Sequence, residues 1–310
     1  MYVNFAILVL SLWVIVMLCN LCPRNCNVDR DKGDLGYCRA PADMVIARYS
    51  KHMWEEPVLS GDQGSGTIFF SYCNLKCCFC QNYEISEFHK GRRVSIEEFA
   101  DICLDLQDSG VHNINLVTPV MFVPKIIEGL KIAQDRGLNI PVVYNTSSYE
   151  NVDTIKMLDG YVDIYLPDLK YYDDRLGRKY SNCRDYFQYA SKAIDEMIKQ
   201  VGKVVIDDDG MMIRGVIVRH MVMPGGVDDS KKIIRYLYEK YHDDIVISIM
   251  NQYTPVRVSK YSELNCKVNG QEYDEVVDFA YDLGVRNAFI QEGDSQEISF
   301  IPDFDMFRAL

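Results

Sequence analysis

The sequence is short of positive charge and has no basic tract. It carries 33 Lys and Arg against 45 Asp and Glu, a formal net charge of −12. Proteins that bind a phosphate backbone gather basic residues, so this balance argues against nucleic-acid binding. No short-period repeat or low-complexity linker is present. With 310 residues, the chain can form one large α/β domain with an appendage, or two ordinary domains.

The N-terminal stretch lacks the basic region and the small-residue cleavage site of a secretory signal. Residues 1–18 are apolar except for Asn4 and Ser11, and their number is at the low end of the roughly 17–25 residues that span a bilayer. Positive residues follow only from Arg24 onward, so an inserted helix would leave the remainder in the cytoplasm. Two interpretations stay open: a membrane anchor, or an extension that packs on the domain or has no function.

Cysteine, by contrast, is abundant and grouped. Disulfide frameworks belong mostly to shorter secreted chains, whereas short C-x2-C spacings are typical of metal ligation. We therefore expect a reducing, cytoplasmic compartment, low in oxygen if the metal is iron–sulfur. Eight of the eleven cysteines form two groups, Cys19, Cys22, Cys26 and Cys38 first, then Cys73, Cys77, Cys78 and Cys80.

Apolar, β-branched runs alternate with helical patterns from about Gly64 onward. The runs are nearly continuous, as expected of strands buried on both faces of a parallel sheet. Their alternation with helices predicts a parallel α/β architecture, open or closed into a barrel. Residues 19–63 are predicted to be loop-rich. The expected strands are 66–72, 113–118, 141–147, 162–170, 215–223, 245–253 and a further candidate at 287–291, and the expected helices are 95–110, 123–137, 182–202, 228–241 and 271–284.

The second cysteine group directly follows the first of these strands. Cys73-x3-Cys77-x2-Cys80 places three thiolates on a tight loop. A cubane iron–sulfur cluster otherwise takes four cysteines, so three leave one iron open, as a catalytic zinc keeps an open position. Using Cys78 breaks this spacing, and neighbours in a loop tend to point apart, so we predict that Cys78 is not a ligand. Zinc, or buried free thiols, is the alternative.

The spacing C-x3-C-x-aromatic-C resembles the signature of the radical S-adenosylmethionine superfamily. More narrowly, CNLKCCFCQN is similar to the pyruvate formate-lyase activating enzyme group. The resemblance runs from about Cys19 to Pro255 and includes EEPVLSGDQGSGTIFFSYCNLKCCFCQNYEIS, NINLVTP, YNTSSYE, VDIYLPDLKYYD and VRHMVMPG. It implies a partial (β/α)6 barrel of the TIM type over residues 64–310. A Cys-rich metal-binding segment, 19–63, would precede it.

The resemblance also implies a chemistry. Cys73, Cys77 and Cys80 would hold a [4Fe–4S] cluster whose open iron is chelated by S-adenosylmethionine. Electron transfer would cleave this cofactor to methionine and a 5′-deoxyadenosyl radical, which abstracts a hydrogen atom. The implied partners are an electron donor of the flavodoxin or ferredoxin type and, in the activating-enzyme branch, a glycyl-radical enzyme. A small-molecule substrate and a non-catalytic iron–sulfur electron-transfer role are the alternatives.

Further cofactor-binding residues follow from the matched motifs. Phe79 matches the aromatic residue that contacts adenine, and Asn82 matches the asparagine after the last cysteine. Thr118 lies in LVTP, where activating enzymes carry a Gly-Gly-Glu-Pro-like segment; with no glutamate here, backbone carbonyls or the Thr118 hydroxyl would accept from the methionine amino group. Asn145 and Thr146 match an Asp-Thr pair near the ribose or methionine end of the cofactor.

Later strand ends supply the remaining candidates. Ser148 stands where a glycine is usual, which predicts an altered turn. Asp168 and Lys170 match an Asp-x-Lys pair; two residues apart on a strand, they share one face, and an ordinary solvated pair is the alternative. Arg219 is predicted to bind the carboxylate of the cofactor, because a guanidinium binds planar oxygens bidentately. His220 points to the opposite face and is predicted to be packed.

The first cysteine group, Cys19-x2-Cys22-x3-Cys26-x11-Cys38, supplies four potential ligands. Four thiolates suit either a closed tetrahedral zinc or a second [4Fe–4S] cluster, and the spacing does not choose between them. A second cluster could relay electrons to the first, whereas a zinc ion would only fold the segment. Free packed thiols are the remaining alternative.

Overall fold

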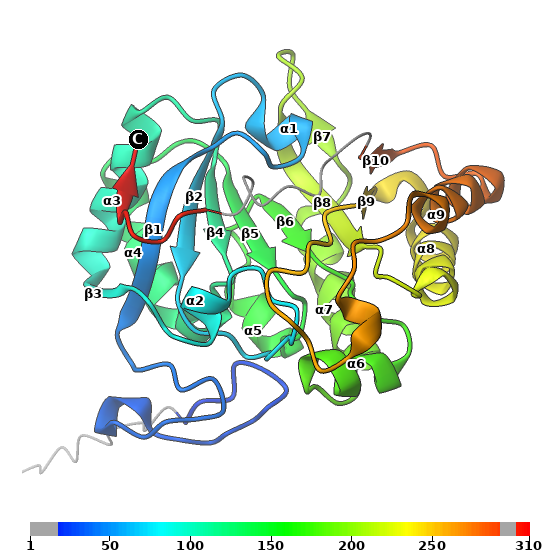
Figure 1. Cartoon of the computed structure of the whole chain (residues 1–310). Helices are drawn as coiled ribbons and strands as arrows, with labels where there is room; N and C mark the ends of the chain where they lie inside the picture. The colour runs from blue at the N-terminus through cyan, green and yellow to red at the C-terminus, as the bar shows by residue number, and fades with distance from the viewer. Residues whose placement is uncertain (1–17, 292–301) are drawn as a thin grey trace, which may run out of the picture.

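A parallel sheet curls into an open barrel with helices on its outside in the computed structural model, which describes residues 18–291 and 302–310 (Figure 1). The strand order is β10-β9-β8-β6-β5-β4-β2-β1-β11, and neighbours from β10 to β2 are parallel. The predicted partial α/β barrel is therefore confirmed. The strands are β1 Met44–His52, β2 Ser65–Phe70, β3 Arg92–Val94, β4 Ile114–Val117, β5 Val142–Thr146, β6 Ile164–Pro167, β7 Val205–Ile206, β8 Met212–Met221, β9 Val246–Met250, β10 Ala288–Ile290 and β11 Arg308–Ala309.

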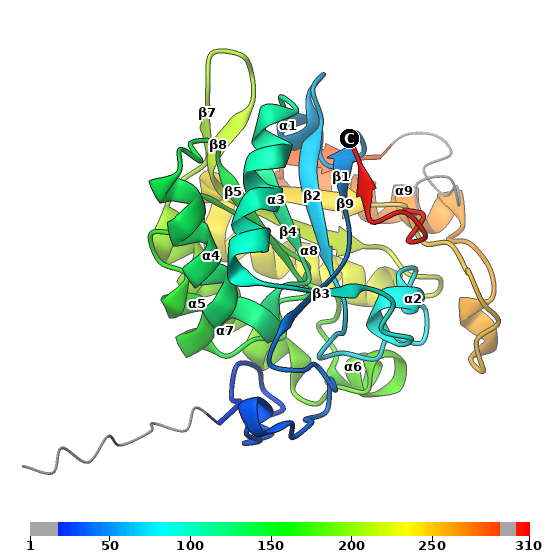
Figure 2. The ribbon, with the colours of Figure 1, turned by 90° about the vertical axis from the view of Figure 1, so that its left-hand side faces the viewer.

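Helices between the parallel strands cover the outer face of the sheet (Figure 2). The first long one starts where the sequence predicts, because the Ser95 hydroxyl accepts a hydrogen bond from the Glu98 N–H and caps the helix. It ends before Gly110, whose φ of +81° a helix cannot continue. The helices are α1 Pro57–Ser60, α2 Tyr83–Ser86, α3 Ile96–Asp108, α4 Val123–Asp135, α5 Val152–Met157, α6 Asp174–Ser181, α7 Tyr186–Val201, α8 Val227–Tyr241 and α9 Gly270–Leu283.

The core lies between the sheet and the helices, and a second apolar layer lines the barrel. Every residue of β2, β4, β5 and β6 is buried, as their continuous apolar runs predict. On the helix side, the ring of Phe70 packs against Phe99 of α3 and Phe122, with centroids 6.1 and 6.0 Å apart. Burial of these aromatic side chains fixes the sheet against the helix layer.

Strand β1 corrects one prediction. Residues 44–52 were assigned to the loop-rich segment 19–63, yet they form a nine-residue strand antiparallel to β2. Charged residues such as Arg48 and Lys51 interrupt the apolar pattern and hid the strand from sequence reasoning. The sheet therefore begins before residue 64, and the Cys-rich segment ends near residue 43.

The helical pattern at 182–202 also differs from its prediction. Asn182 and Asp185 take left-handed backbone conformations, with φ of +49° and +54°. These positions end α6 and delay the start of α7 to Tyr186. The prediction for residues 1–18 lies outside the described residues, apart from Leu18. In the part of the chain that the structure describes, no helix is long and apolar enough to cross a membrane.

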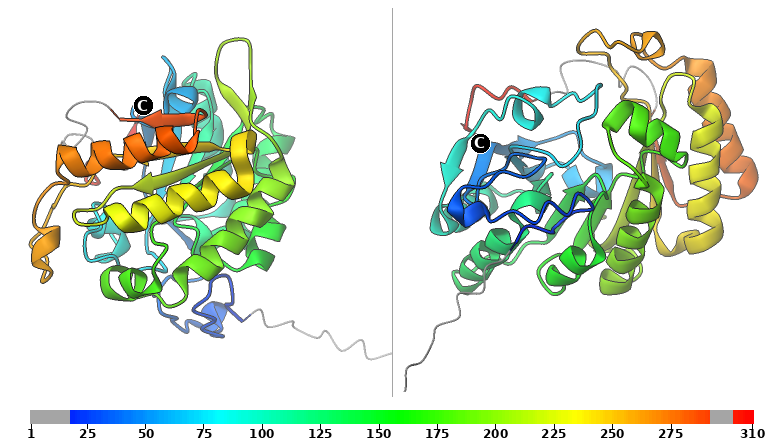
Figure 3. Two further views of the ribbon diagram at one scale, coloured as in Figure 1. Left: turned by 90° about the vertical axis from the view of Figure 1, so that its right-hand side faces the viewer. Right: turned by 90° about the horizontal axis from the view of Figure 1, so that it is seen from below.

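The Cys-rich segment lies at the carboxyl ends of the barrel strands, beside the loop that follows β2 (Figure 3). It has little regular structure. Arg24 connects the segment to the cluster loop, residues 73–80, because its guanidinium donates to the Asn74 carbonyl at 3.1 Å. The same guanidinium donates to the carbonyl of Asn182, the residue after α6, at 2.7 Å. Asn151 donates to the Asn20 carbonyl at 2.6 Å. The segment and the cluster loop therefore form one contiguous surface.

Candidate functional site

The parallel strands enclose a cavity of about 540 Å³, within the roughly 300–1,000 Å³ typical of small-molecule and cofactor sites. The structure brings together in its wall every residue predicted for the cluster and for S-adenosylmethionine. The three thiols and the Phe79 ring belong to the cluster loop, and Asn82 follows that loop. The other residues lie at or near the carboxyl ends of the strands. The full set is Cys73, Cys77, Cys80, Phe79, Asn82, Thr118, Asn145, Thr146, Asp168, Lys170 and Arg219.

The cluster loop separates its four cysteines as the x3/x2 spacing predicts. Cys73, Cys77 and Cys80 line the cavity, whereas Cys78 does not. The Cys78 sulfur instead lies 3.9 Å from the Ser259 hydroxyl, on the other side of the loop. This separation supports three ligands with Cys78 as a bystander.

No three His, Cys, Asp or Glu side chains within residues 18–291 and 302–310 are arranged to hold a metal ion. In the cluster loop the thiols of Cys77 and Cys80 contact the hydroxyls of Ser181 and Ser86, at 2.9 and 3.3 Å. Ligation therefore requires these thiols to rotate away from the hydroxyls toward the cavity that all three cysteines line. The donor set itself, three cysteines on one loop facing one cavity, fits an iron–sulfur cluster with an open iron.

The positive charge of Lys170 acts on two of these thiols, Cys73 and Cys77. Burial raises the pKa of Cys77 to about 11, and the ammonium of Lys170 opposes that rise. Burial likewise raises the pKa of Cys73, again against Lys170. Because only thiolates ligate metals, loading of the site releases protons. Lys170 lowers the free energy of that step.

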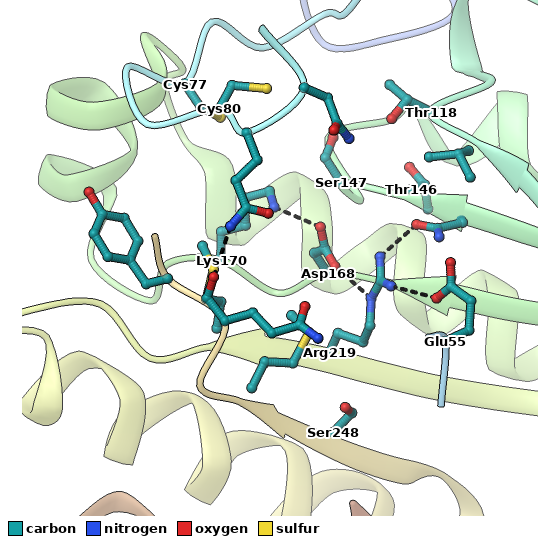
Figure 4. A pocket seen from close by; sticks show the side chains of 18 of the residues that line it. Glu55, Cys77, Cys80, Thr118, Thr146, Ser147, Asp168, Lys170, Arg219 and Ser248 are labelled. Atoms are coloured by element: carbon teal, nitrogen blue, oxygen red, sulfur yellow. Dashed lines mark hydrogen bonds and ion pairs between the residues drawn. The ribbon is translucent and has the colours of Figure 1, made fainter. Parts of the chain in front are cut away.

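A buried ion network continues from Lys170 along the cavity (Figure 4). Lys170 Nζ donates to Asp168 Oδ2 at 2.6 Å, and Arg219 Nε donates to Asp168 Oδ1 at 3.0 Å. The Arg219 guanidinium also donates to Glu55 Oε2 at 3.2 Å and Asn145 Oδ1 at 2.6 Å. Asp168 and Lys170 share one face as predicted, and they are not the solvated pair of the alternative, since their side chains are 16% and 21% exposed.

The carboxyl groups of the network differ in the direction of their pKa shifts. Burial raises the pKa of Asp168, but the neighbouring Lys170 and Arg219 outweigh this effect and lower it, so Asp168 is ionised at neutral pH. Burial also raises the pKa of Glu55 and of Glu56, and for both the opposing effect of Arg219 is the smaller one. In this network Arg219 already has two carboxylate neighbours inside the protein, and its predicted role toward a cofactor carboxylate stays a prediction.

Two strand ends of the cavity carry unusual backbone conformations. Thr118 after β4 and Ser148 after β5 have φ of +57° and +63°, values that a β-branched residue such as threonine rarely adopts. Thr118 N–H donates to the Asn145 carbonyl at 2.9 Å, and the Ser148 hydroxyl donates to the Asp168 carbonyl at 2.7 Å. The serine thus keeps the left-handed turn expected of a glycine and adds a hydrogen bond to Asp168, the residue that follows β6.

Thr146 points toward a buried carboxyl behind the cavity. Its hydroxyl donates to Glu150 Oε1, and the Tyr144 hydroxyl donates to Oε2 at 2.8 Å. Burial raises the pKa of Glu150 from 4.5 to about 7, although both hydroxyls oppose the rise. Glu150 is therefore largely protonated in slightly acidic solution in the folded protein and ionised in the unfolded chain.

This carboxyl makes a testable contribution to stability. An acid whose folded pKa is raised stabilises fully below its unfolded pKa, near 4.5, and this stability is lost as the pH rises through about 7. The difference corresponds to roughly 3 kcal/mol. Between pH 4.5 and 7.5, the unfolding free energy of the wild type, measured by urea denaturation, should therefore fall by about this much relative to Glu150→Gln. Parallel pH curves would contradict the assignment, and Glu97→Gln on the surface of α3 is the control.

Sequence reasoning placed His220 correctly but missed the acidic end of the cavity. His220 is 2% exposed, and its ring nitrogens lie 2.8 Å from the Leu169 carbonyl and the Ser230 hydroxyl, as expected of a packed histidine. Glu55 and Glu56 line the cavity. The available signal was two adjacent acidic residues inside MWEEPVL, an otherwise apolar stretch.

The four cysteines of the first group surround a much smaller cavity, about 10 Å³. Cys19, Cys22, Cys26 and Cys38 all line it, together with Arg24 and Arg30 among others. The Tyr37 N–H donates to the Cys26 sulfur at 3.2 Å, and a Cβ at Gly36 would lie only 2.9 Å from that sulfur. The loop therefore wraps closely around the Cys26 sulfur. As in the cluster loop, no three of these cysteine side chains, all within the described residues, are arranged to hold a metal ion, so ligation requires the thiols to reorient.

Comparison with known proteins agrees with this fold and site. Residues 67–237 match the Radical SAM superfamily. An uncharacterized protein of Methanocaldococcus jannaschii is 30% identical over 272 residues, which cover 84% of this chain and 74% of that protein. A pyruvate formate-lyase-activating enzyme of Clostridium pasteurianum is 25% identical over 235 residues, 72% of this chain and 88% of that enzyme.

A solved structure supports the fold alone. The FeFe-hydrogenase maturase HydG of Carboxydothermus hydrogenoformans superposes with a TM-score of 0.50 at 14% identity, over 77% of this chain and 56% of that one. The chain thus spans little more than half of that solved protein. Fold, cysteine loop and sequence match define an S-adenosylmethionine-dependent iron–sulfur enzyme. The chain belongs to the Radical SAM superfamily, whose fold implies a [4Fe–4S] cluster and S-adenosylmethionine.

Proposed function

We propose that this protein uses Cys73, Cys77 and Cys80 to hold a [4Fe–4S] cluster and cleaves S-adenosylmethionine to take a hydrogen atom from a substrate. When bound, the cluster and S-adenosylmethionine supply an electron and a 5′-deoxyadenosyl radical. One observation carries the proposal: the three thiols and the eight other predicted residues line a single cavity. A non-catalytic electron carrier has no need of such a cavity.

Each part of the cavity wall has a task in this proposal. The Phe79 ring, 9% exposed and 6.0 Å from the Tyr253 ring between centroids, provides an apolar surface for adenine. Asn82 and the backbone at Thr118 supply polar groups for the methionine and ribose. Lys170 offsets the negative charge of the thiolates, and Asp168 keeps Lys170 in position.

Two kinds of substrate have support. The identity with a pyruvate formate-lyase-activating enzyme favours a glycyl-radical enzyme as partner, with the hydrogen atom taken from a glycine. A cavity that continues past Arg219 to the buried Glu55 and Glu56 favours the second candidate, a small molecule. In either case a flavodoxin or ferredoxin would supply the electron. A reducing, cytoplasmic location accords with cysteines that are all unpaired.

The deciding experiment is anaerobic reconstitution with iron and sulfide, reduction, and addition of S-adenosylmethionine. We expect 5′-deoxyadenosine and methionine in equal amounts. An intact cluster that forms neither product would refute the proposed reaction. Electron spin resonance after addition of a candidate glycyl-radical enzyme separates the branches, because only the activating branch leaves a glycyl radical on the partner.

For the first cysteine group we propose zinc rather than a second [4Fe–4S] cluster. The four cysteines line one space of about 10 Å³, so a single ion requires less movement of the loop than a cubane. Between Cys19 and Asp43, only Leu21 and Ala40 are buried hydrophobic residues, so an apolar core does not order this segment. A four-thiolate zinc site supplies that order in small domains.

The prediction for this site is a change in metal content. The purified wild type should contain one zinc per chain, and Cys22→Ser should lose most of it while keeping the iron of the cluster loop. Zinc and iron are measured together by plasma mass spectrometry, with Cys266→Ser, an exposed cysteine outside both groups, as control. Eight iron atoms per wild-type chain would show a second cluster, and unchanged zinc in Cys22→Ser would exclude this site.

A further inference from the structure

Glu55 and Glu56 lie at the end of the cavity away from the cysteines. His52 of β1 pairs with Ser65, the first residue of β2, whereas the cluster loop follows the last. The segment after His52 therefore reaches the amino ends of the parallel strands. In Figure 4, Asp168 and Arg219 lie between Glu55 and Ser248 on one side and Cys77 and Cys80 on the other. One continuous cavity thus has a thiol end and a carboxylate end.

The carboxylate end has more hydrogen-bond acceptors than donors. Glu55 accepts from Arg219 at 3.2 Å and from Asn115 Nδ2 at 3.1 Å. Glu56 is 8% exposed and its carboxyl group is hydrogen-bonded to the Ser248 side chain. Within residues 18–291 and 302–310 its buried Oε2 atom has no hydrogen-bond partner. This atom, on a residue of the cavity wall, is an acceptor without a donor.

The charges of the network likewise favour a ligand that carries a positive charge. Asp168, Glu55 and Glu56 are three carboxyl groups beside the two cations Arg219 and Lys170, and burial raises the pKa of both glutamates. A cation bound beside the glutamates favours their ionised forms. A buried carboxylate oxygen without a hydrogen-bond donor is destabilising. A ligand that brings one positive charge and several N–H donors removes that destabilisation. An alkylammonium group does both, because it carries three donors and one full charge.

Apolar side chains of the same cavity wall fit the carbon chain of such a ligand. Trp54 and Phe289 line the cavity, and Phe289 pairs in register with Ser248, at the level of Arg219. An aromatic face near a cation adds a further attraction. A bare metal cation fits less well, since it prefers six or more oxygen ligands, and the Glu55 carboxylate is already bonded to Arg219 and Asn115.

We propose that Glu55 and Glu56 bind the ammonium group of a small alkylamine substrate at the end of the cavity opposite the cluster loop. The carbon chain of the amine then extends from the glutamates toward Arg219 and the thiol end. That the bound amine is the molecule that loses the hydrogen atom rests on the proposed function. The binding of the ammonium group does not.

The test is isothermal titration of the reconstituted protein, with S-adenosylmethionine present, against n-butylammonium chloride at pH 7.5. 1-Butanol is the uncharged match, and potassium chloride is the inorganic cation. We expect n-butylammonium to bind with at least tenfold higher affinity than 1-butanol, and Glu56→Gln to weaken it at least tenfold. Glu97→Gln, an exposed glutamate of α3, should bind as the wild type does.

Three results would overturn the proposal: equal binding by Glu56→Gln, equal binding of 1-butanol, or potassium that binds tightly and excludes n-butylammonium. Glu56→Gln should fold, because an amide of the same shape replaces a carboxylate with an unsatisfied oxygen. If it does not fold, the preference of the wild type for n-butylammonium over 1-butanol and potassium decides. Formation of 5′-deoxyadenosine in the same preparation is scored separately, so a failure of the proposed function is distinguished from a failure of this site.

Discussion

Replacement of Cys77 by alanine is expected to remove the cluster and to lower 5′-deoxyadenosine formation at least about 100-fold. With one of three thiols gone, the loop retains only two ligands of a cluster that otherwise takes four. Cys78→Ala, one residue away, is the matched variant. Its side chain lies outside the cavity, beside Ser259, so both the cluster and the reaction should persist. Iron and sulfide content, visible absorbance and product formation measure the effect.

Comparing Cys77→Ala with Cys78→Ala distinguishes the loss of a cluster ligand from a general disturbance of the fold. Both cysteines lie in the same loop, and both are partly buried, so a general disturbance of the loop would affect both variants. If Cys78→Ala loses the cluster while Cys77→Ala keeps it, the choice of three ligands is wrong. If both keep it, the cluster is bound elsewhere.

Replacement of Arg219 by methionine should lower the free energy of unfolding by about 3–5 kcal/mol. The guanidinium is the shared partner of Asp168 and Glu55, with nitrogen–oxygen distances of 3.0 and 3.2 Å. Its side chain is 14% exposed, so the ion pairs are largely shielded from bulk water. The loss leaves Glu55 without its cation and leaves Asp168 with Lys170 alone. Urea denaturation of the apoprotein measures the change.

An exposed arginine provides the control for this effect. Arg136 pairs with Asp101 at 2.7 Å, but the two side chains are 47% and 59% exposed, and such pairs contribute about 1 kcal/mol or less. Arg136→Met should therefore be nearly neutral. Adding Glu55→Gln to Arg219→Met should recover part of the lost stability, because the ion pair of Glu55 is with Arg219, whereas Asp168 keeps Lys170. Additive losses in the double variant would show that the two side chains act independently.

Local spacing made the cysteine loop and the strand-end residues predictable. The signal for Cys73, Cys77 and Cys80 lies within eight consecutive positions, and a parallel barrel brings its strand ends to one edge. For the same reason Asp168 and Lys170 could be placed on one face. What they contact inside the protein could not be read in this way, because Asp168 and Arg219 are 51 residues apart in the chain.

The acidic end of the cavity required the three-dimensional structure. Glu55 meets Arg219 across 164 residues, and it does so only because β1 runs antiparallel to β2 and returns the chain to the amino ends of the strands. The sequence conceals β1 behind Arg48 and Lys51, so the position of the glutamates could not be inferred. A pattern of apolar runs identifies strands buried on both faces, but it is weaker for a strand at the edge of a sheet.

The edge position of β1 has a consequence for solubility. A nine-residue edge strand exposes a row of N–H and C=O groups to which other chains can pair. Here β3 covers Met44–Ile46, and β11, close to the last residue, pairs with Tyr49 and Ser50 (Figure 1). β3 and β11 thus shield the edge of β1 against intermolecular sheet formation, and deletion of β11 would act first on aggregation rather than on catalysis.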